Sequence, residues 1–286
     1  MNMKERSESA RGAGAPWSPT LDPYAAPPDA ALPALADLLG CGADDLRPLL
    51  PQLTAAWVAD DAGVIALRRT PRADLEVLGG ARPGPQQAEV AAALLRAASA
   101  SGTPLSAYAD DALLPGDTLR TLGWEHAGQY TEWHGPLPTP EISVPAGVRI
   151  LPLADAPDLT VRWEAQGTYA DRLGHTLVSD TDIVPGAHGA DDRVGHIALD
   201  RTGRGVGICR AWLDGDTLTI GSPGIHPDLR HTALRHALLR ATCDAARLRG
   251  VRQLIMQAWG DTPAETLMDT DLGLQAVTVT PIYLSR

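Results

Sequence analysis

The chain has 286 residues, of which 44% are hydrophobic, enough to fill the core of one large domain or two ordinary ones. Its formal net charge of −11 argues against nucleic acid and anionic lipid as partners, since both require a basic surface. The cysteines Cys41, Cys209 and Cys243 lie far apart without metal-ligand spacing, so we predict neither a disulfide framework nor a metal site. No segment resembles a membrane span or a secretory signal, and we expect a cytoplasmic protein with a disordered start over residues 1–28.

The chain contains an internal repeat, because matching residues occur in the same order in both halves. The matched pairs are Gly63 with Gly205, Asp74 with Asp216, the ALLRA runs at 93–97 and 237–241, Gly102 with Gly250, and Leu122-Gly123 with Leu272-Gly273. Chance in an Ala- and Leu-rich chain would explain one such match but not the ordered series. We therefore predict a duplicated domain.

Local patterns predict the same kinds of element in both repeats. In chain order they are strands over 64–69 and 75–78, a helix containing residues 90–97, a strand over 104–109, a strand over 148–153, helical structure over 159–178, strands over 206–213 and 217–220, a helix containing residues 234–248, and a strand over 253–258. Each half then closes with a short helix, Leu-Gly and a final pair of strands. This order predicts an α/β (α+β) fold, with a mixed, mostly antiparallel sheet flanked by helices in each half. We expect domains over 29–135 and 147–286, joined by a stiff Pro-rich linker over 136–146.

A candidate anion site lies where a strand of the second repeat leads into its long helix. Residues 221–230 read GSPGIHPDLR, so the strand breaks at Gly and Pro immediately before the helix. Main-chain N–H groups at a helix start, together with the positive end of the helix dipole, suit a phosphate or pyrophosphate. The junction is therefore the first place to look for a phosphate-bearing ligand.

The same junction resembles the V-x-P-x-x-R segment that precedes the phosphate-binding loop in the GCN5-related N-acetyltransferase (GNAT) superfamily. The later Leu272-Gly273-Leu274 is similar to the Leu-Gly-aromatic ending of that fold, and the first repeat ends on Leu122-Gly123-Trp124. The likeness covers residues 148–286 well and residues 50–135 less well. The chain is similar to tandem members such as mycothiol synthase-like proteins, which implies two GNAT-like domains, one cofactor site, and acetyl-CoA or another acyl-CoA as cofactor.

The resemblance implies a cofactor-binding loop in the second repeat, formed by Gly224, Ile225, His226, Arg230, His231, Ala233, Leu234 and Arg235. Three departures from the family pattern stand out. Ala233 replaces the central glycine of the R/Q-x-x-G-x-G/A motif, and Arg235 replaces its last small residue. Asp269 stands where the family usually has the tyrosine that protonates the leaving thiolate. In the first half the corresponding residues 82–87 keep little of the motif, so we expect that half to be structural.

Catalysis in this superfamily also needs a base that deprotonates the amine. The candidates are Glu164, Tyr169 and Asp261, with Asp171, His175 and Trp259 nearby. Most of these lie in the helical segment that borders the acceptor pocket in the fold the chain resembles, while Trp259 and Asp261 follow the strand over 253–258. A solvated helix face, or for Trp259 a core aromatic, is the simpler interpretation of each.

Two functions follow from these observations. The first is an acyl-CoA-dependent N-acyltransferase acting on a small amine or a peptide amine, as a monomer or homodimer. The second is a catalytically degenerate protein of the same fold, acting as a coenzyme A sensor or an interaction module, which Ala233, Arg235 and Asp269 favour. An α/β hydrolase or nucleotide-binding enzyme is disfavoured, because their glycine-rich motifs are missing. An open gap between the strands ending at Gly224 and beginning at Leu254 would favour the first function, and a closed gap the second.

Overall fold

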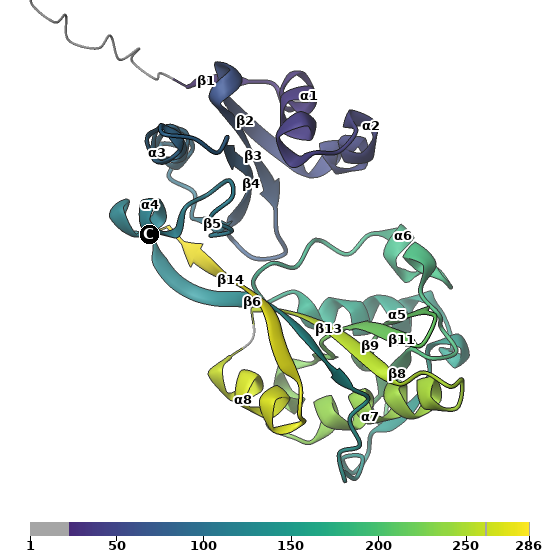
Figure 1. Ribbon diagram of the computed structural model, residues 1–286. Coiled ribbons are helices and arrows are strands. Elements are labelled where there is room, and N and C mark those ends of the chain that lie inside the picture. Colours follow the sequence, from purple (N-terminus) through teal and green to yellow (C-terminus); the bar gives the residue numbers. More distant parts are fainter. Residues whose placement is uncertain (1–22, 261, 286) are drawn as a thin grey trace, which may run out of the picture.

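The computed structural model describes residues 23–260 and 262–285, which form two lobes (Figure 1). The elements of the N-terminal half are β1 (Tyr24–Ala26), α1 (Pro28–Leu39), α2 (Ala43–Leu46), β2 (Leu53–Ala59), β3 (Gly63–Arg69), β4 (Leu75–Ala81), α3 (Gln87–Ser99), β5 (Leu105–Tyr108), α4 (Gly116–Thr121) and β6 (Glu125–Pro136). Those of the C-terminal half are β7 (Arg149–Pro152), α5 (Leu159–Gln166), α6 (Asp180–Ile183), β8 (His196–Leu199), β9 (Gly205–Cys209), β10 (Ala211–Asp214), β11 (Thr217–Gly221), β12 (Gly224–Ile225), α7 (Leu234–Arg247), β13 (Gln253–Trp259), α8 (Pro263–Asp271) and β14 (Gln275–Leu284).

The strands of the described chain form two sheets. A ten-stranded sheet has the order β1-β2-β3-β4-β5-β14-β6-β13-β11-β10, and a four-stranded sheet has the order β12-β9-β8-β7. Most neighbours run antiparallel, but β4 pairs with β5 and β11 with β13 in parallel. The predicted mixed, mostly antiparallel sheet flanked by helices is therefore confirmed.

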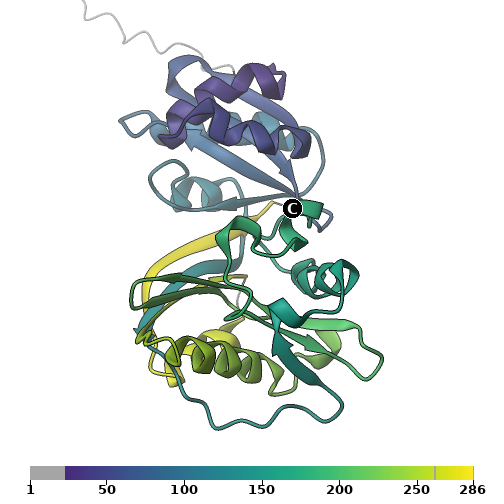
Figure 2. The same ribbon diagram turned by 90° about the vertical axis from the view of Figure 1, so that its right-hand side faces the viewer.

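Helices cover both faces of the upper part of the large sheet. Alternate residues of β3 point to opposite faces, as the strand period of two requires. Val64 and Ala66 pack against α1, whereas Ile65 and Leu67 pack in the cluster that contains α3. Figures 1 and 2 show α1 and α3 on opposite sides of these strands.

The helices α3 and α7, the corresponding members of the repeat, lie where apolar periodicity predicted them. Leu94 and Leu238 are fully buried within them, as the apolar stripe of an amphipathic helix requires. Gly102 and Gly250 follow the two helices with φ of +74° and +83°, a conformation that glycine adopts without strain. The duplicated pattern thus produces duplicated helices.

The two halves exchange their last strands. β6 pairs antiparallel with β13 of the C-terminal half, from Gln253↔Pro136 to Trp259↔Tyr130. In turn, the end of β14 pairs with β5 of the N-terminal half, and β6 and β14 pair with each other. The predicted domain ranges follow the chain, whereas the sheet joins both halves through these two strands. Residues 137–148, which carry no helix or strand, connect β6 of the N-terminal half to β7 of the C-terminal half.

Some local predictions differ from the structure. The strand predicted over 206–213 is two strands, because β9 and β10 belong to different sheets and part at Arg210. Helical structure predicted over 159–178 stops after the short turn Gly167–Tyr169, and Gly174 follows with φ of +76°. Disorder was predicted to residue 28, but β1 pairs with β2 at residues 24–26. Residues 1–22 of that prediction lie outside the described residues.

A gap between strands forms where the chain passes from the large sheet to the small one. β11 pairs with β13 as far as Gly221↔Gln257, and Ser222 N donates one more hydrogen bond to Gln257 O at 2.7 Å. Pro223 then contributes no N–H. β12 turns away to pair with β9 of the smaller sheet. The strands β12 and β13 therefore diverge next to the start of α7.

Candidate functional site

A cavity of about 370 Å³ lies between the start of α7, helix α8 and the loop that follows α5. Three of the predicted cofactor-binding residues line it: Ile225, Arg230 and Arg235. Gly224 and Leu234 are buried beside it, while His231 and Ala233 are exposed at the helix start. His226 accepts a hydrogen bond from Asp228 N at 3.4 Å, within the turn before α7. The fold therefore gathers the predicted loop around one cavity.

The start of α7 keeps part of its capacity to bind an anion. Arg230 N and Thr232 N donate to main-chain carbonyls of the preceding turn, and Leu234 N donates to the Thr232 hydroxyl at 3.3 Å. Within residues 23–260 and 262–285, the amides of His231 and Ala233 have no hydrogen-bond partner. A helix start leaves such N–H groups open unless a cap or a ligand takes them.

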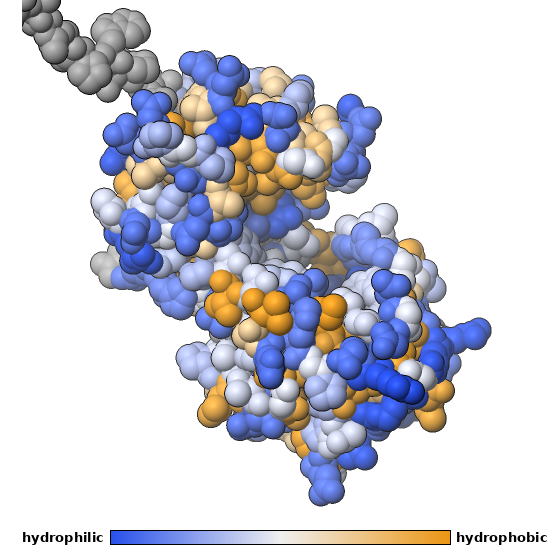
Figure 3. Space-filling view, in the orientation of Figure 1, coloured by the Kyte–Doolittle hydropathy of each residue, from blue (hydrophilic) through white to orange (hydrophobic). Residues whose placement is uncertain are grey.

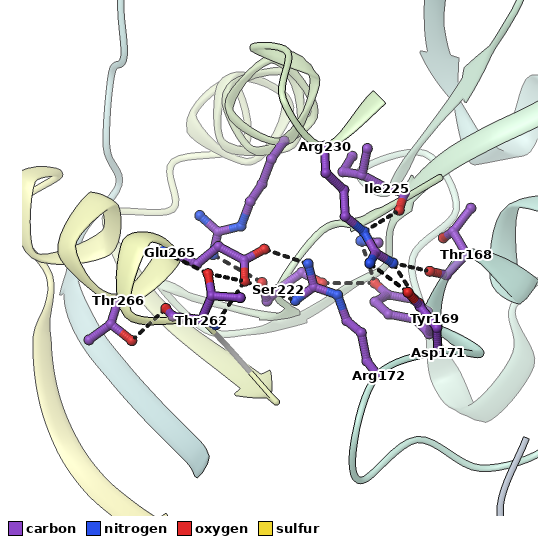
Figure 4. Close-up of polar contacts among 12 residues, drawn as sticks. Thr168, Tyr169, Asp171, Arg172, Ser222, Ile225, Arg230, Thr262, Glu265 and Thr266 are labelled. Atoms are coloured by element: carbon purple, nitrogen blue, oxygen red, sulfur yellow. Dashed lines mark hydrogen bonds and ion pairs between the residues drawn. The ribbon is translucent and has the colours of Figure 1, made fainter. Parts of the chain in front are cut away.

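The guanidinium of Arg230 is already engaged. Its Nη1 and Nη2 atoms donate to both carboxylate oxygens of Asp171 at 2.6 Å, and Nε donates to Ile225 O at 3.1 Å (Figure 4). The hydrogen bond from Arg230 lowers the pKa of Asp171, so this carboxylate stays charged. Asp171, which we considered as a possible base, thus serves as an ion-pair partner.

Two of the departures from the GNAT pattern contact each other. Arg235 donates from Nη1 and Nη2 to the two oxygens of Asp269 at 2.7 and 2.8 Å, and also to Ser222 Oγ at 3.0 Å. Asp269 is 0% exposed and Arg235 is 6% exposed. This buried bidentate pair joins α7, α8 and the bend after β11.

A third ion pair links the loop after α5 to helix α8. Arg172, from the loop after α5, pairs with Glu265 in the first turn of α8 (Figure 4). Burial raises the pKa of Glu265, but the hydrogen bond and charge of Arg172, the Thr262 amide and the charge of Arg235 together lower it by more, so the net pKa is lowered. Glu265 also caps α8 by accepting from Thr262 N at 3.0 Å. Arg172 thereby ties the loop to the helix start.

The hydroxyl of Tyr169 lies at the bend between β11 and β12. It donates to Ser222 O at 2.8 Å and accepts from Gly224 N at 2.9 Å. The ring stacks on His175, with centroids 4.5 Å apart. Burial raises the pKa of Tyr169, so the phenol stays neutral at physiological pH.

Of the other predicted catalytic residues, the structure describes only Glu164, which does not line the cavity. Glu164 accepts a hydrogen bond from Gly205 N at 2.9 Å and so fastens α5 to β9. Asp261 lies outside the described residues. Trp259 packs against Tyr130 and His175. Sequence reasoning missed Arg172 and Glu265, since neither belongs to a motif, but Arg235 and Asp269 carried a signal in their opposite charges at two altered positions.

Figure 3 shows the two lobes joined by a narrower waist, with a hollow between them on the side of α6. A smaller cavity of about 190 Å³ lies near this junction, lined by Pro71, Tyr169, His175 and Arg210 among others. In the part of the chain that the structure describes, no cluster of His, Cys, Asp or Glu side chains could hold a metal ion. None of the helices described there has the length and apolar character needed to cross a bilayer.

The sequence matches neither protein-family models nor curated proteins. Solved structures do resemble it. A GCN5-related N-acetyltransferase from Sphaerobacter thermophilus has 17% identity and a TM-score of 0.59, over 92% of this chain and 95% of its own. A probable N-acyltransferase from Enterococcus faecalis has 10% identity and a TM-score of 0.56, over 90% and 70%. A GCN5-related N-acetyltransferase from Anabaena variabilis has 13% identity and a TM-score of 0.53, over 90% and 69%.

These likenesses establish the fold. The chain has the GNAT fold, and the predicted resemblance is confirmed at that level across most of its length.

The residues present do not fit a coenzyme A molecule in the way the resemblance implied. The four arginines that line the cavity each have a carboxylate partner: Arg72 with Asp74, Arg172 with Glu265, Arg230 with Asp171, and Arg235 with Asp269. The paired charges cancel, which leaves these cations little attraction for a pyrophosphate. The strand groups that a pantetheine arm would use at the bend are bonded to Tyr169.

Proposed function

We propose that the chain is a catalytically silent protein of the GNAT fold that acts as an interaction module. The observation that carries this proposal is the buried pair between Arg235 and Asp269. Arg235 stands where the phosphate loop needs a small residue, and its guanidinium is held by Asp269. Asp269 stands where a tyrosine would protonate a thiolate, and it is fully buried with both oxygens accepting from arginine. A carboxylate whose two oxygens both accept hydrogen bonds from an arginine is poorly placed to donate a proton to a thiolate.

An acyl-CoA-dependent N-acyltransferase, acting on a small amine or a peptide amine, is the second candidate. The cavity of about 370 Å³ and the open amides of His231 and Ala233 favour it. Within either candidate we propose a cytoplasmic monomer or homodimer. Nucleic acid and anionic membranes are not proposed as partners, because the net charge of −11 would repel both.

The two candidates differ in what the purified full-length chain does with acetyl-CoA. We expect no heat of binding at millimolar ligand in isothermal titration calorimetry, and no amine-dependent release of free thiol with a panel of primary amines and peptides. Thiol release that disappears in Arg230→Ala would overturn the proposal and support the acyltransferase.

A matched variant tests the cause. Arg235→Gly combined with Asp269→Tyr restores both family residues without leaving an unpaired buried charge. We expect this double variant to bind inorganic pyrophosphate detectably, unlike the wild type, because this probe has no pantetheine arm that must pass Tyr169. Pyrophosphate binding that stays undetectable in the folded double variant would show that the Arg235–Asp269 pair is not what excludes the phosphates.

A further inference from the structure

We propose that Tyr169 closes the cofactor slot of the C-terminal half by occupying, with its own hydroxyl, the main-chain groups that a pantetheine amide would use. The inference rests on the proposed function, because it names the residue that keeps the cofactor arm out of the silent site. It assigns to Tyr169 a role in specificity in place of the predicted role as a base.

The chemistry of the phenol suits this role. An amide of a pantetheine arm offers one N–H donor and one carbonyl acceptor, and a hydroxyl likewise both donates and accepts. At the bend, Ser222 offers a carbonyl and Gly224 an N–H, and the Tyr169 hydroxyl bonds to both at 2.8 and 2.9 Å. Pro223 between them has no N–H of its own. Tyr169 therefore satisfies the polar groups that the change of sheet leaves unpaired.

The local sequence makes room for the phenol. A Cβ atom on Gly224 would lie 2.6 Å from the Tyr169 ring and 2.6 Å from Thr168 Oγ1. Glycine at this position is therefore needed for the ring to reach the bend. The ring is then held on its other side by the stacked His175. Gly224, Tyr169 and His175 form one packed unit at the bend that leads into β12.

The pocket beside this unit is correspondingly small. Tyr169, His175 and Trp259 line it together with Gly221, Ser222 and Gln257 of the divergent strands. These strand residues come from β11, β13 and the bend that follows β11, so the aromatic side chains stand where a ligand would have to pass between the strands. Arg172 lines the same pocket and closes the side toward α8. Removal of the Tyr169 ring would open this path without changing any of the four ion pairs of the cavity.

Removing the ring in the full-length protein tests the inference. We expect Tyr169→Ala to bind pantetheine, the arm without its phosphates, and to gain thermal stability from it, while the wild type shows no shift. Tyr130→Ala is the matched control, because it removes a neighbouring ring that packs on Trp259 and does not contact the bend. Equal responses of wild type and Tyr169→Ala, or of both alanine variants, would overturn the inference.

A second variant covers the possibility that Tyr169→Ala does not fold. Tyr169→Phe keeps the ring and its stacking but removes the hydroxyl. We expect hydrogen exchange at Gly224 N to become about tenfold faster, the scale of one hydrogen bond between uncharged groups. Unchanged exchange at Gly224 would show that the hydroxyl does not hold the bend. The exchange measurement is independent of acetyl-CoA turnover, so failure of this inference and failure of the proposed function can be told apart.

Discussion

The two halves close the corresponding gap in different ways. In the C-terminal half the side chain of Tyr169 occupies the bend after β11. In the N-terminal half β4 and β5 pair only at Leu75↔Leu105 and Glu76↔Ser106 before they diverge. There the Leu113 carbonyl enters and accepts a hydrogen bond from Ala81 N at 2.9 Å. A main-chain group therefore fills one gap, and a side chain fills the other.

This difference bears on how permanent each closure is. The loop that carries Leu113 is anchored, because Asp110 Oδ1 accepts from Leu113 N at 2.8 Å and from Leu114 N at 3.1 Å. One substitution cannot remove a main-chain carbonyl, whereas it can remove a tyrosine. The halves also differ next to the gap, since the buried Leu119 stands at the repeat position of Asp269. The N-terminal half therefore has a main-chain closure and an apolar residue at this position. The C-terminal half is closed by the Tyr169 side chain, next to a buried ion pair.

The largest loss of stability is expected from breaking the buried Arg235–Asp269 ion pair of the C-terminal half. Asp269→Ala would leave the buried Arg235 guanidinium without its carboxylate, which costs about 3–5 kcal/mol of unfolding free energy. Urea denaturation of the full chain measures this loss. Arg235→Met with Asp269→Leu should recover most of the stability, because the buried charges are then removed together.

Asp44→Asn is the control for that experiment. Its ion pair with Arg47 is exposed on both sides, so the unfolding midpoint should stay within error of the wild type. If Asp269→Ala is no less stable than Asp44→Asn, the Arg235–Asp269 pair does not hold the half together.

A smaller loss of stability is expected from a side chain placed against the Leu113 carbonyl in the N-terminal half. A Cβ atom on Gly80 would lie 2.4 Å from the Leu113 carbonyl oxygen, so Gly80→Ala must push the anchored loop away. We expect a loss of about 1–3 kcal/mol, typical of overpacking. Gly221→Ala is the matched control, since no atom lies within 4 Å of its Cβ position. Equal midpoints for the two variants in urea would contradict a tight main-chain closure.

The smallest effect concerns pH and the stacking partner of Tyr169. Burial lowers the pKa of His175 from its ordinary value of 6.5 to about 4, and Arg172 adds to the shift. The folded chain therefore binds this proton less readily than the unfolded chain, so stability is full above about pH 6.5 and falls as the pH drops toward 4. His175→Gln should flatten this fall in thermal melts recorded across that range.

The fall is not expected to vanish in that variant. Burial also lowers the pKa of His196 and of His236, which act in the same direction. A pH profile identical to that of the wild type would show that His175 is not protonated on unfolding, and that its contact with Tyr169 does not depend on the neutral ring.

The helices were the most predictable part of the fold. Apolar residues at helical spacing around Leu94 and Leu238 placed α3 and α7, because burial of one helix face leaves its period in the sequence. The exchange of β6 and β14 could not be predicted in this way. Strand periodicity shows which face is buried but not which strand lies alongside, and both strands follow a Leu-Gly ending in the same repeat position.

The candidate site, too, has features that the sequence predicts and features that only the structure shows. Its position at the start of α7 and the altered residues Arg235 and Asp269 could be recognised from the sequence, because each departs from a short local motif. Tyr169 was singled out too, but for a role in proton transfer. Its bond to Ser222 spans 53 positions, and only the change of sheet at Pro223 creates the groups that it satisfies.

Local pattern therefore suffices for the duplication, for the helices and for the place where a ligand of this fold would bind, since all three depend on residues close together in the chain. Whether that ligand site is closed depends on contacts between residues far apart in the chain. Arg235 and Asp269 are 34 positions apart and meet only because the fold brings α7 and α8 side by side. Whether two altered residues leave a site open or fill it depends on the distance between them, and tertiary packing sets that distance.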